Sequence, residues 1–227
     1  MQIFNMVSLI RIQISGIFVG VLLCIPMVVR AHVPNIIVQD SLKDIEVITD
    51  PELSQAFYGE LSGFPHTYEI QAKEPFTLFT QILQPDIESS KNNISGLVIK
   101  DRGRGSRVEK IVSLKATDGL WETSYEPFGG DTYRNGPSFE RTLDPGIYRI
   151  EVNTPNNVEK YVLVVGKREE MTLGYFELVG RIAEVKVFFG KSKFRVIESP
   201  FVYVPVLILG VIIGYIVYRK RRKERHV

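Results

Sequence analysis

The chain has 227 residues, of which 44% are hydrophobic and 24% charged, and its formal net charge is +2. Residues 1–31 hold two of the 28 basic residues and no acid, and residues 219–227 hold six basic residues and one acid. This leaves 20 basic against 25 acidic residues in between. A region with this acidic excess is not expected to bind nucleic acid, whose phosphates attract basic surfaces. Cys24 is the only cysteine, so an apolar core rather than disulfides must stabilise the middle region.

Residues 1–31 have the pattern of a signal peptide. Arg11 precedes an apolar run from Ile12 to Val29, and Val29-Arg30-Ala31 places small residues where signal peptidase requires them. The run is long enough that the segment could also remain uncleaved as an anchor. In both cases we expect the middle region to be exported and to lie outside the cell.

Residues 32–166 alternate short apolar runs with turn residues, which is typical of an antiparallel β-sandwich. Asp144-Pro145-Gly146 is the clearest turn, because proline presets the first central torsion and glycine accepts a positive one. We expect strands at Ile45–Ile48, Phe57–Leu61, Thr67–Ala72, Phe76–Leu83, Leu97–Lys100, Val108–Leu114, Trp121–Tyr125, Phe139–Leu143, Ile147–Val152 and Tyr161–Val165. The fold class predicted for this extracellular domain is therefore mainly β.

Part of this region resembles the bacterial pre-peptidase C-terminal domains. The matching runs are Phe57…Gly59-x-Leu61, Tyr68-x-Ile70, Phe76-x-Leu78, Phe139…Leu143-x-Pro145-Gly146-Ile147-Tyr148-x-Ile150-x-Val152 and Lys160-Tyr161-x-Leu163-x-Val165. The resemblance covers roughly residues 57–166 and implies a jelly-roll-like sandwich with an accessory binding role. The acidic residues of that family are absent near Ser95-Gly96-Leu97 and no peptidase accompanies the domain, so the resemblance implies no functional residue.

A juxtamembrane segment is expected at residues 167–199. From Thr172 to Phe189 the apolar residues recur at steps of three and four, which predicts an amphipathic helix. Such a helix either packs against the sandwich or lies on the lipid surface, and both interpretations stay open. Gly174 and Gly180 disfavour a helix, so a strand-rich stalk is a further alternative.

The run Phe201–Tyr218 has no charged side chain and would span roughly 27 Å as a helix. We predict a transmembrane helix at residues 200–218 and a basic cytoplasmic tail at 219–227, which makes the chain a single-pass type I protein of the cell membrane. The lipid bilayer is then one partner, and Gly210-x-x-x-Gly214 allows a homo-oligomer through this helix. The expected membrane-anchoring residues are Tyr203, Tyr215, Tyr218, Arg219, Lys220, Arg221 and Arg222.

Catalytic motifs are missing from the sequence. It contains no Gly-x-Ser-x-Gly, no His-Glu-x-x-His, no phosphate-binding loop and no cysteine after the signal segment. We therefore expect neither an enzyme nor a cofactor. One metal site is conceivable: cleavage after Ala31 would make His32 the first residue, whose amine and imidazole could chelate copper with help from His66. The alternative for His66 is a solvated histidine in a Phe64-Pro65-His66 turn.

Aromatic and flexible polar residues gather between Trp121 and Pro137, and residues 128–137 are predicted to form a long loop at the rim of the sandwich. The candidate ligand-binding residues are Trp121, Tyr125, Asp131, Tyr133 and Arg134. Core packing explains Trp121 and Tyr125 equally well. The leading hypothesis is a non-catalytic module that binds an extracellular protein or glycan; the alternatives are an exported copper-binding protein and a structural subunit of a membrane complex.

Overall fold

A computed structural model of the chain describes residues 33–103, 108–170 and 174–225. The predicted signal segment and His32 lie outside the described residues. The strands are β1 Val33–Ile37, β2 Ile45–Ile48, β3 Gln55–Glu60, β4 His66–Ala72, β5 Phe76–Pro85, β6 Ser95–Asp101, β7 Glu109–Leu114, β8 Glu122–Glu126, β9 Asp131–Leu143, β10 Gly146–Asn153 and β11 Lys160–Val165. The helices are η2 Ala116–Asp118, α2 Tyr175–Phe188, η3 Lys193–Glu198 and α3 Pro200–Glu224.

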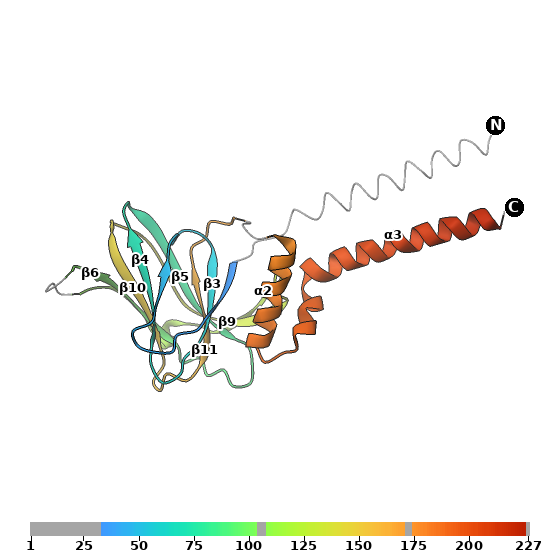
Figure 1. The fold of residues 1–227 in the computed structure, drawn as a ribbon. Helices are drawn as coiled ribbons and strands as arrows, with labels where there is room; N and C mark the ends of the chain where they lie inside the picture. The colour runs from blue at the N-terminus through green and yellow to red at the C-terminus, as the bar shows by residue number, and fades with distance from the viewer. Residues whose placement is uncertain (1–32, 104–107, 171–173, 226–227) are drawn as a thin grey trace. The chain divides into compact units, whose positions relative to one another are not determined.

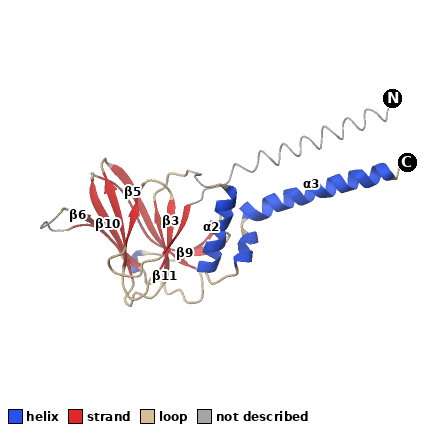
Figure 2. Cartoon of the chain, viewed as in Figure 1, coloured by secondary structure: helices blue, strands red, loops and turns tan. Residues whose placement is uncertain are grey.

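The strands form a two-sheet sandwich (Figures 1 and 2). One sheet has six strands in the order β1-β3-β11-β5-β9-β8, and the other has five in the order β2-β4-β10-β6-β7. Most neighbouring strands are antiparallel, but β1 pairs with β3, and β2 with β4, in parallel. The predicted mainly β sandwich is thus confirmed, with each sheet mixed at one edge.

All ten predicted strands are present, and β1 is an eleventh strand that the sequence did not reveal. The largest difference in bounds concerns β9, which begins at Asp131 rather than at Phe139. The pairing of β9 with β5 is irregular between Gln81 and Leu83, where Gly136-Pro137 forms a bulge. Because a bulge lets these two residues sit within a strand, the loop predicted at residues 128–137 is wrong from Asp131 onward.

The main core lies between the sheets and comes from alternate residues of the strands. Tyr68, Ile70, Tyr148 and Ile150 are examples, all at most 1% exposed. His66 is in the same inward register as Tyr68, so it is completely buried and its interpretation as a solvated turn residue is wrong. Burial lowers the pKa of His66.

A small polar cluster lies within this core. The Tyr161 hydroxyl lies 2.8 Å from His66 Nδ1 and 2.7 Å from the Tyr68 hydroxyl. Gly59 makes space for it, because a Cβ there would lie only 2.5 Å from the Tyr161 oxygen. The three polar side chains therefore pair with one another where water has no access, although His66 Nε2 has no hydrogen-bond partner in the described part of the chain.

The helix α2 covers the outer face of the six-stranded sheet. Val185 and Phe189, the latter just after the helix, pack against Ala56, Tyr58 and Val162. The strands β3 and β11 are consequently buried on both faces, which explains their continuous apolar sequence. The predicted amphipathic helix is thus present, and it packs against the sandwich; a strand-rich stalk is excluded for Tyr175–Phe188.

The helix α3 follows η3 after Ser199. Within the described residues it is the one helix long and apolar enough to cross a membrane, over Pro200–Arg222, and none of its apolar window is buried. The predicted membrane-anchoring residues, Tyr203, Tyr215, Tyr218 and Arg219 to Arg222, all lie on it.

Candidate binding site

The five predicted ligand-binding residues lie on one hairpin, formed by β8 and β9 and the turn between them. They do not form a single site. Trp121, just before β8, lines an open pocket, whereas Asp131 and Tyr133 are buried near the other end of the hairpin. Arg134 and Tyr125 have separate surroundings, described below. We therefore treat two regions: the Trp121 pocket and the ion cluster around Asp131.

The Trp121 pocket has a volume of about 730 Å³ and lies where three loops meet. Those loops follow β5, β7 and β10. The side chains that matter for its chemistry are Asn92, Asn93, Ser95, Lys115, Trp121 and Asn153. One aromatic ring, three carboxamides and a hydroxyl thus surround a space open to solvent, with Lys115 as the charged member of this group.

Trp121 has a backbone conformation that bulky residues rarely adopt. Its φ is 54°, in the left-handed region, which costs roughly 1–3 kcal/mol for a residue other than glycine. The indole Nε1 donates to Ala116 O at 2.8 Å, and the backbone N donates to Asn135 O at 2.9 Å. The ring lies against Gly136, where a Cβ would be 2.7 Å from it. Several independent contacts therefore hold a strained aromatic residue at the pocket.

The carboxamide oxygen of Asn93 is buried and accepts no hydrogen bond from the described part of the chain. An unpaired buried acceptor is costly unless another group supplies a donor. Nearby, the Ser95 hydroxyl accepts a hydrogen bond from Ala116 N at 3.0 Å, which joins two of the pocket's loops. The wall of the pocket therefore contains an unpaired acceptor that is itself closed to solvent.

Arg134 supports the pocket from behind instead of lining it. Its guanidinium donates to Asp86 at 2.7 Å, to Ser90 O at 3.2 Å and to Asn92 Oδ1 at 3.4 Å. These bonds fix the loop between β5 and β6, which carries Asn92 and Asn93. Arg134 is accordingly a positioning residue for the pocket.

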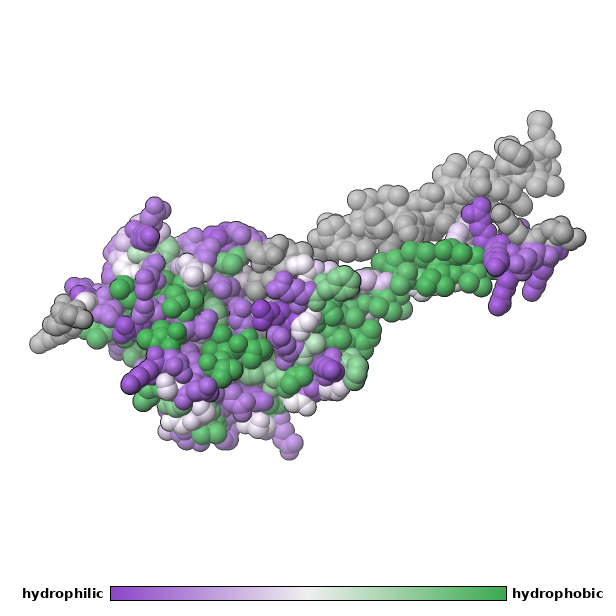
Figure 3. All heavy atoms as spheres, viewed as in Figure 1, coloured by the Kyte–Doolittle hydropathy of each residue, from purple (hydrophilic) through white to green (hydrophobic). Residues whose placement is uncertain are grey.

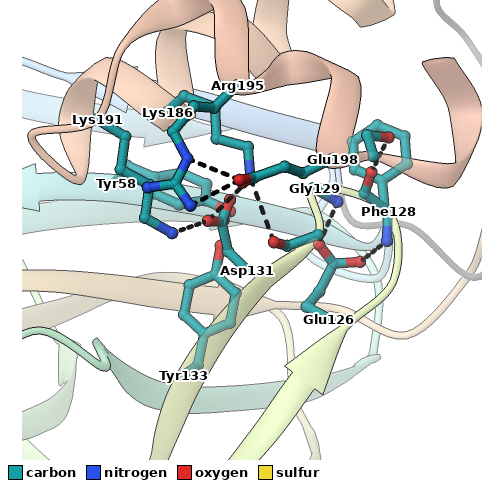
Figure 4. A network of polar contacts seen from close by, with 12 residues as sticks. Tyr58, Glu126, Phe128, Gly129, Asp131, Tyr133, Lys186, Lys191, Arg195 and Glu198 are labelled. Atoms are coloured by element: carbon teal, nitrogen blue, oxygen red, sulfur yellow. Dashed lines mark hydrogen bonds and ion pairs between the residues drawn. The ribbon is translucent and has the colours of Figure 1, made fainter. Parts of the chain in front are cut away.

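The ion cluster lies where α2 and η3 meet the β8–β9 turn (Figure 4). The side chains of Lys186 and Asp131 are both 0% exposed, with Nζ and Oδ1 3.0 Å apart. Lys191 contacts the same oxygen at 2.7 Å, and Lys186 also contacts Glu198 at 3.3 Å and Gly130 O at 3.2 Å. Because its carboxylate is buried among lysines, Asp131 is not available to a ligand at the surface, contrary to the sequence-based hypothesis.

Three further side chains next to the ion cluster, Tyr58, Tyr133 and Glu126, are wholly or partly shielded from water. Tyr133 and Tyr58 share a hydrogen bond of 2.8 Å, and burial raises the pKa of both phenols, so they remain protonated. Burial also raises the pKa of Glu126, although its carboxylate accepts hydrogen bonds from Gly129 N at 2.6 Å and Phe128 N at 2.7 Å. Tyr133 therefore has no exposed group with which it could contact a ligand in the predicted role.

Tyr125 is 59% exposed and lies close enough to Tyr203 of α3 for the two phenols to interact electrostatically. Next to it, the rings of Phe128 and Phe201 pack edge to face with centroids 4.9 Å apart. The end of the hairpin thus contacts the start of α3. Tyr125 lies apart from the pocket residues.

The proposed copper ligands do not form a site in the described chain. His66 is enclosed in the core with Tyr161, and His32 lies outside the described residues. Across residues 33–103, 108–170 and 174–225, no three His, Cys, Asp or Glu side chains are grouped so as to hold a metal ion.

No family model matches the chain, and no curated protein matches it. Among solved structures it is similar to the pre-peptidase C-terminal domain of a collagenase from Bacillus anthracis, with 12% identity, a TM-score of 0.35, and coverage of 56% of this chain and 98% of that one. It is also similar to a β-glucosidase from Paenibacillus barengoltzii, with 12% identity, a TM-score of 0.27, and coverage of 61% and 14%. The weak resemblance predicted from the sequence is confirmed, and it carries no argument about function.

Proposed function

We propose that the protein is a single-pass type I membrane protein that displays its β-sandwich outside the cell and binds a glycan in the Trp121 pocket. The membrane part rests on α3, on the basic residues that follow its apolar run and on the export pattern of residues 1–31. The observation that carries the binding part is the strained Trp121 at an open pocket that carboxamide side chains also line.

Glycans fit the chemistry of this pocket. An indole ring presents a flat apolar surface against which the C–H face of a sugar ring can stack. The carboxamides of Asn92, Asn93 and Asn153 offer donors and acceptors that match sugar hydroxyls without imposing a charge. A hydroxyl-rich ligand therefore suits the pocket, and Lys115 is the one charged side chain that lines it.

Because Trp121 is the only tryptophan, its fluorescence reports directly on the pocket. The full chain in nanodiscs would be titrated with a panel of chito-oligosaccharides, glucans and peptidoglycan fragments. We expect a saturable change in emission with at least one class of glycan. Asn153→Ala should weaken that binding, whereas Gln71→Ala should not, because Gln71 on β4 lies opposite Ile147, at the far end of β10 from Asn153.

Two results would contradict the binding part: a silent Trp121 across the whole panel, or full glycan affinity in the Asn153→Ala variant. The membrane part has its own test. The full chain should stay with membranes during alkaline extraction. Protease added to the outside of intact cells should cut the sandwich after the sandwich has been unfolded.

A further inference from the structure

The outer face of α2 is apolar although it does not contact the sandwich. Phe176, Gly180, Ala183 and Val187 are spaced by four, three and four residues, so they lie within a sector of about 60° on the helix. Phe176 is 88% exposed and Val187 57% exposed. Since the opposite face packs on the sheet, α2 carries a second, narrower apolar strip on its outer side, bordered by the exposed Glu177 and Glu184. A helix at a water-facing surface normally carries mainly polar residues there.

The apolar surface continues onto η3, which lies beside α2 and is joined to it by the ion pair between Glu198 and Lys186. Phe194 is 77% exposed and Ile197 48% exposed. Lys193 lies over the Phe194 ring at 5.7 Å. We call Phe176, Gly180, Ala183, Val187, Phe194 and Ile197 the α2–η3 apolar face; Figure 3 shows hydrophobic surface in this region next to α3.

This face adjoins the first turn of α3. The Tyr175 hydroxyl at the start of α2 donates to Phe201 O at 3.1 Å, and only Ser199 separates η3 from α3. The helix α3 is long and apolar enough to cross a bilayer from Pro200 onward. The apolar face is therefore continuous with the surface that lipid would surround.

We infer that the α2–η3 apolar face inserts into the interfacial layer of the lipid bilayer, so that α2 contacts the sheet on one side and lipid on the other. Aromatic residues such as Phe176 and Phe194 suit this depth, and Lys193, over the Phe194 ring, lies where a lipid phosphate would neutralise it. The inference rests on the proposed single-pass topology and is independent of the glycan. It assigns lipid contact to side chains outside the membrane-crossing helix.

The test uses the full chain with Cys24→Ser, reconstituted in phosphatidylcholine vesicles that contain lipids with a nitroxide at a shallow or a deep acyl carbon. Single cysteines at Phe176, Phe194, Leu120 or Ile213 carry an environment-sensitive fluorophore. Leu120 is the matched control, because it is 84% exposed and apolar but lies between β7 and β8, away from α2 and η3 in the sequence. Ile213, in the middle of α3, reports on the crossing helix.

We expect the labels at Phe176→Cys and Phe194→Cys to be quenched several-fold more strongly by the shallow nitroxide than the label at Leu120→Cys, since interfacial helices lie about 5–10 Å into the headgroup boundary. The label at Ile213→Cys should respond mainly to the deep nitroxide. If the labels at 176 and 194 are quenched no more strongly than the label at 120, the inference is overturned. The proposal that α3 crosses the membrane is not affected by that result. Shielding of both labels from nitroxide and from aqueous iodide would also overturn the inference, because a protein partner would then cover the face. An unquenched label at 213 would refute the membrane topology itself.

Discussion

Polar groups have opposite surroundings at the two ends of the strand β8. Before its first residue, the Trp121 pocket is open and leaves the Asn93 carboxamide oxygen unpaired. After its last residue, the ion cluster is closed, and Lys186 contacts three oxygens with no exposure to water. Paired buried charges serve the fold, whereas neutral polar side chains around an open space are suited to binding. The comparison thus separates the residues that hold the domain together from those to which the proposed function assigns a ligand.

The largest effect on stability is expected in the ion cluster. Lys186→Met leaves the Glu198 contact and one Asp131 contact unmade inside the protein, so it should lower the free energy of unfolding by about 3–5 kcal/mol. Lys191→Met is the matched control, because Lys191 binds the same Asp131 oxygen but its side chain is 26% exposed. It should cost much less. Chemical denaturation of the full chain in detergent measures both, and equal losses would show that burial does not distinguish the two lysines.

A smaller effect on stability is expected at the Trp121 pocket. Gly136→Ala would place a Cβ 2.7 Å from the Trp121 ring and 2.8 Å from Ile82 O, so we expect a loss of about 1–3 kcal/mol and a displaced indole. The emission maximum of Trp121 should shift accordingly. Gly180→Ala is the control: nothing lies within 4 Å of its Cβ, and alanine favours a helix. An unchanged emission spectrum in Gly136→Ala would mean that the ring does not depend on this contact.

The two ends should also differ in their dependence on pH. Burial raises the pKa of Glu126, so the folded protein holds this proton more tightly than the unfolded chain does. The contribution of Glu126 to stability is then present at low pH and is lost as pH rises through the folded-state pKa. Relative to Glu126→Gln, the wild-type free energy of unfolding should fall as the pH rises above about 4.5, by at most about 1.4 kcal/mol per pH unit. A rise over this range would reverse the assignment, and glycan binding should change little.

The smallest effect on stability concerns Arg134, which is one quarter exposed and pairs with a partly exposed Asp86. Arg134→Lys should cost about 1 kcal/mol or less in unfolding free energy. It cannot reproduce the three hydrogen bonds that hold the Asn92 loop, so glycan affinity should suffer more than stability. Calorimetric titration beside thermal unfolding compares the two, and a purely thermal effect would remove Arg134 from the support of the pocket.

Much of the sandwich follows from local pattern, because a strand with one buried face alternates in sequence as Thr67–Ala72 and Ile147–Val152 do. The strand β1 escapes such reasoning, since Val33–Ile37 joins an edge by parallel pairing with a strand about twenty residues later. The start of β9 was misjudged for another reason. Asp131, Gly136 and Pro137 have turn chemistry, but pairing with β5 and β8 on both sides overrides that preference.

The ion cluster could not have been found from the sequence. Lys186 is one of several charged residues between the apolar positions of α2, and nothing local marks it as the buried one. Its partner Asp131 lies 55 residues earlier, so the pairing exists only once α2 covers the sheet. Trp121 was identified as a candidate by its residue type. The structure shows that the ring is partly buried against the main core, as the alternative interpretation predicted, and that its backbone is left-handed, which no sequence pattern indicates.

The single residue between η3 and α3 sets how far the sandwich could reach. Ser199 is itself buried, and its hydroxyl donates to Phe128 O, so no free tether precedes the apolar helix. A domain joined to its membrane helix by a long flexible linker samples a wide volume, whereas a domain without a linker samples only the space next to the membrane. If the proposed glycan binding holds, its ligand would have to reach the membrane surface or belong to the same cell's own envelope.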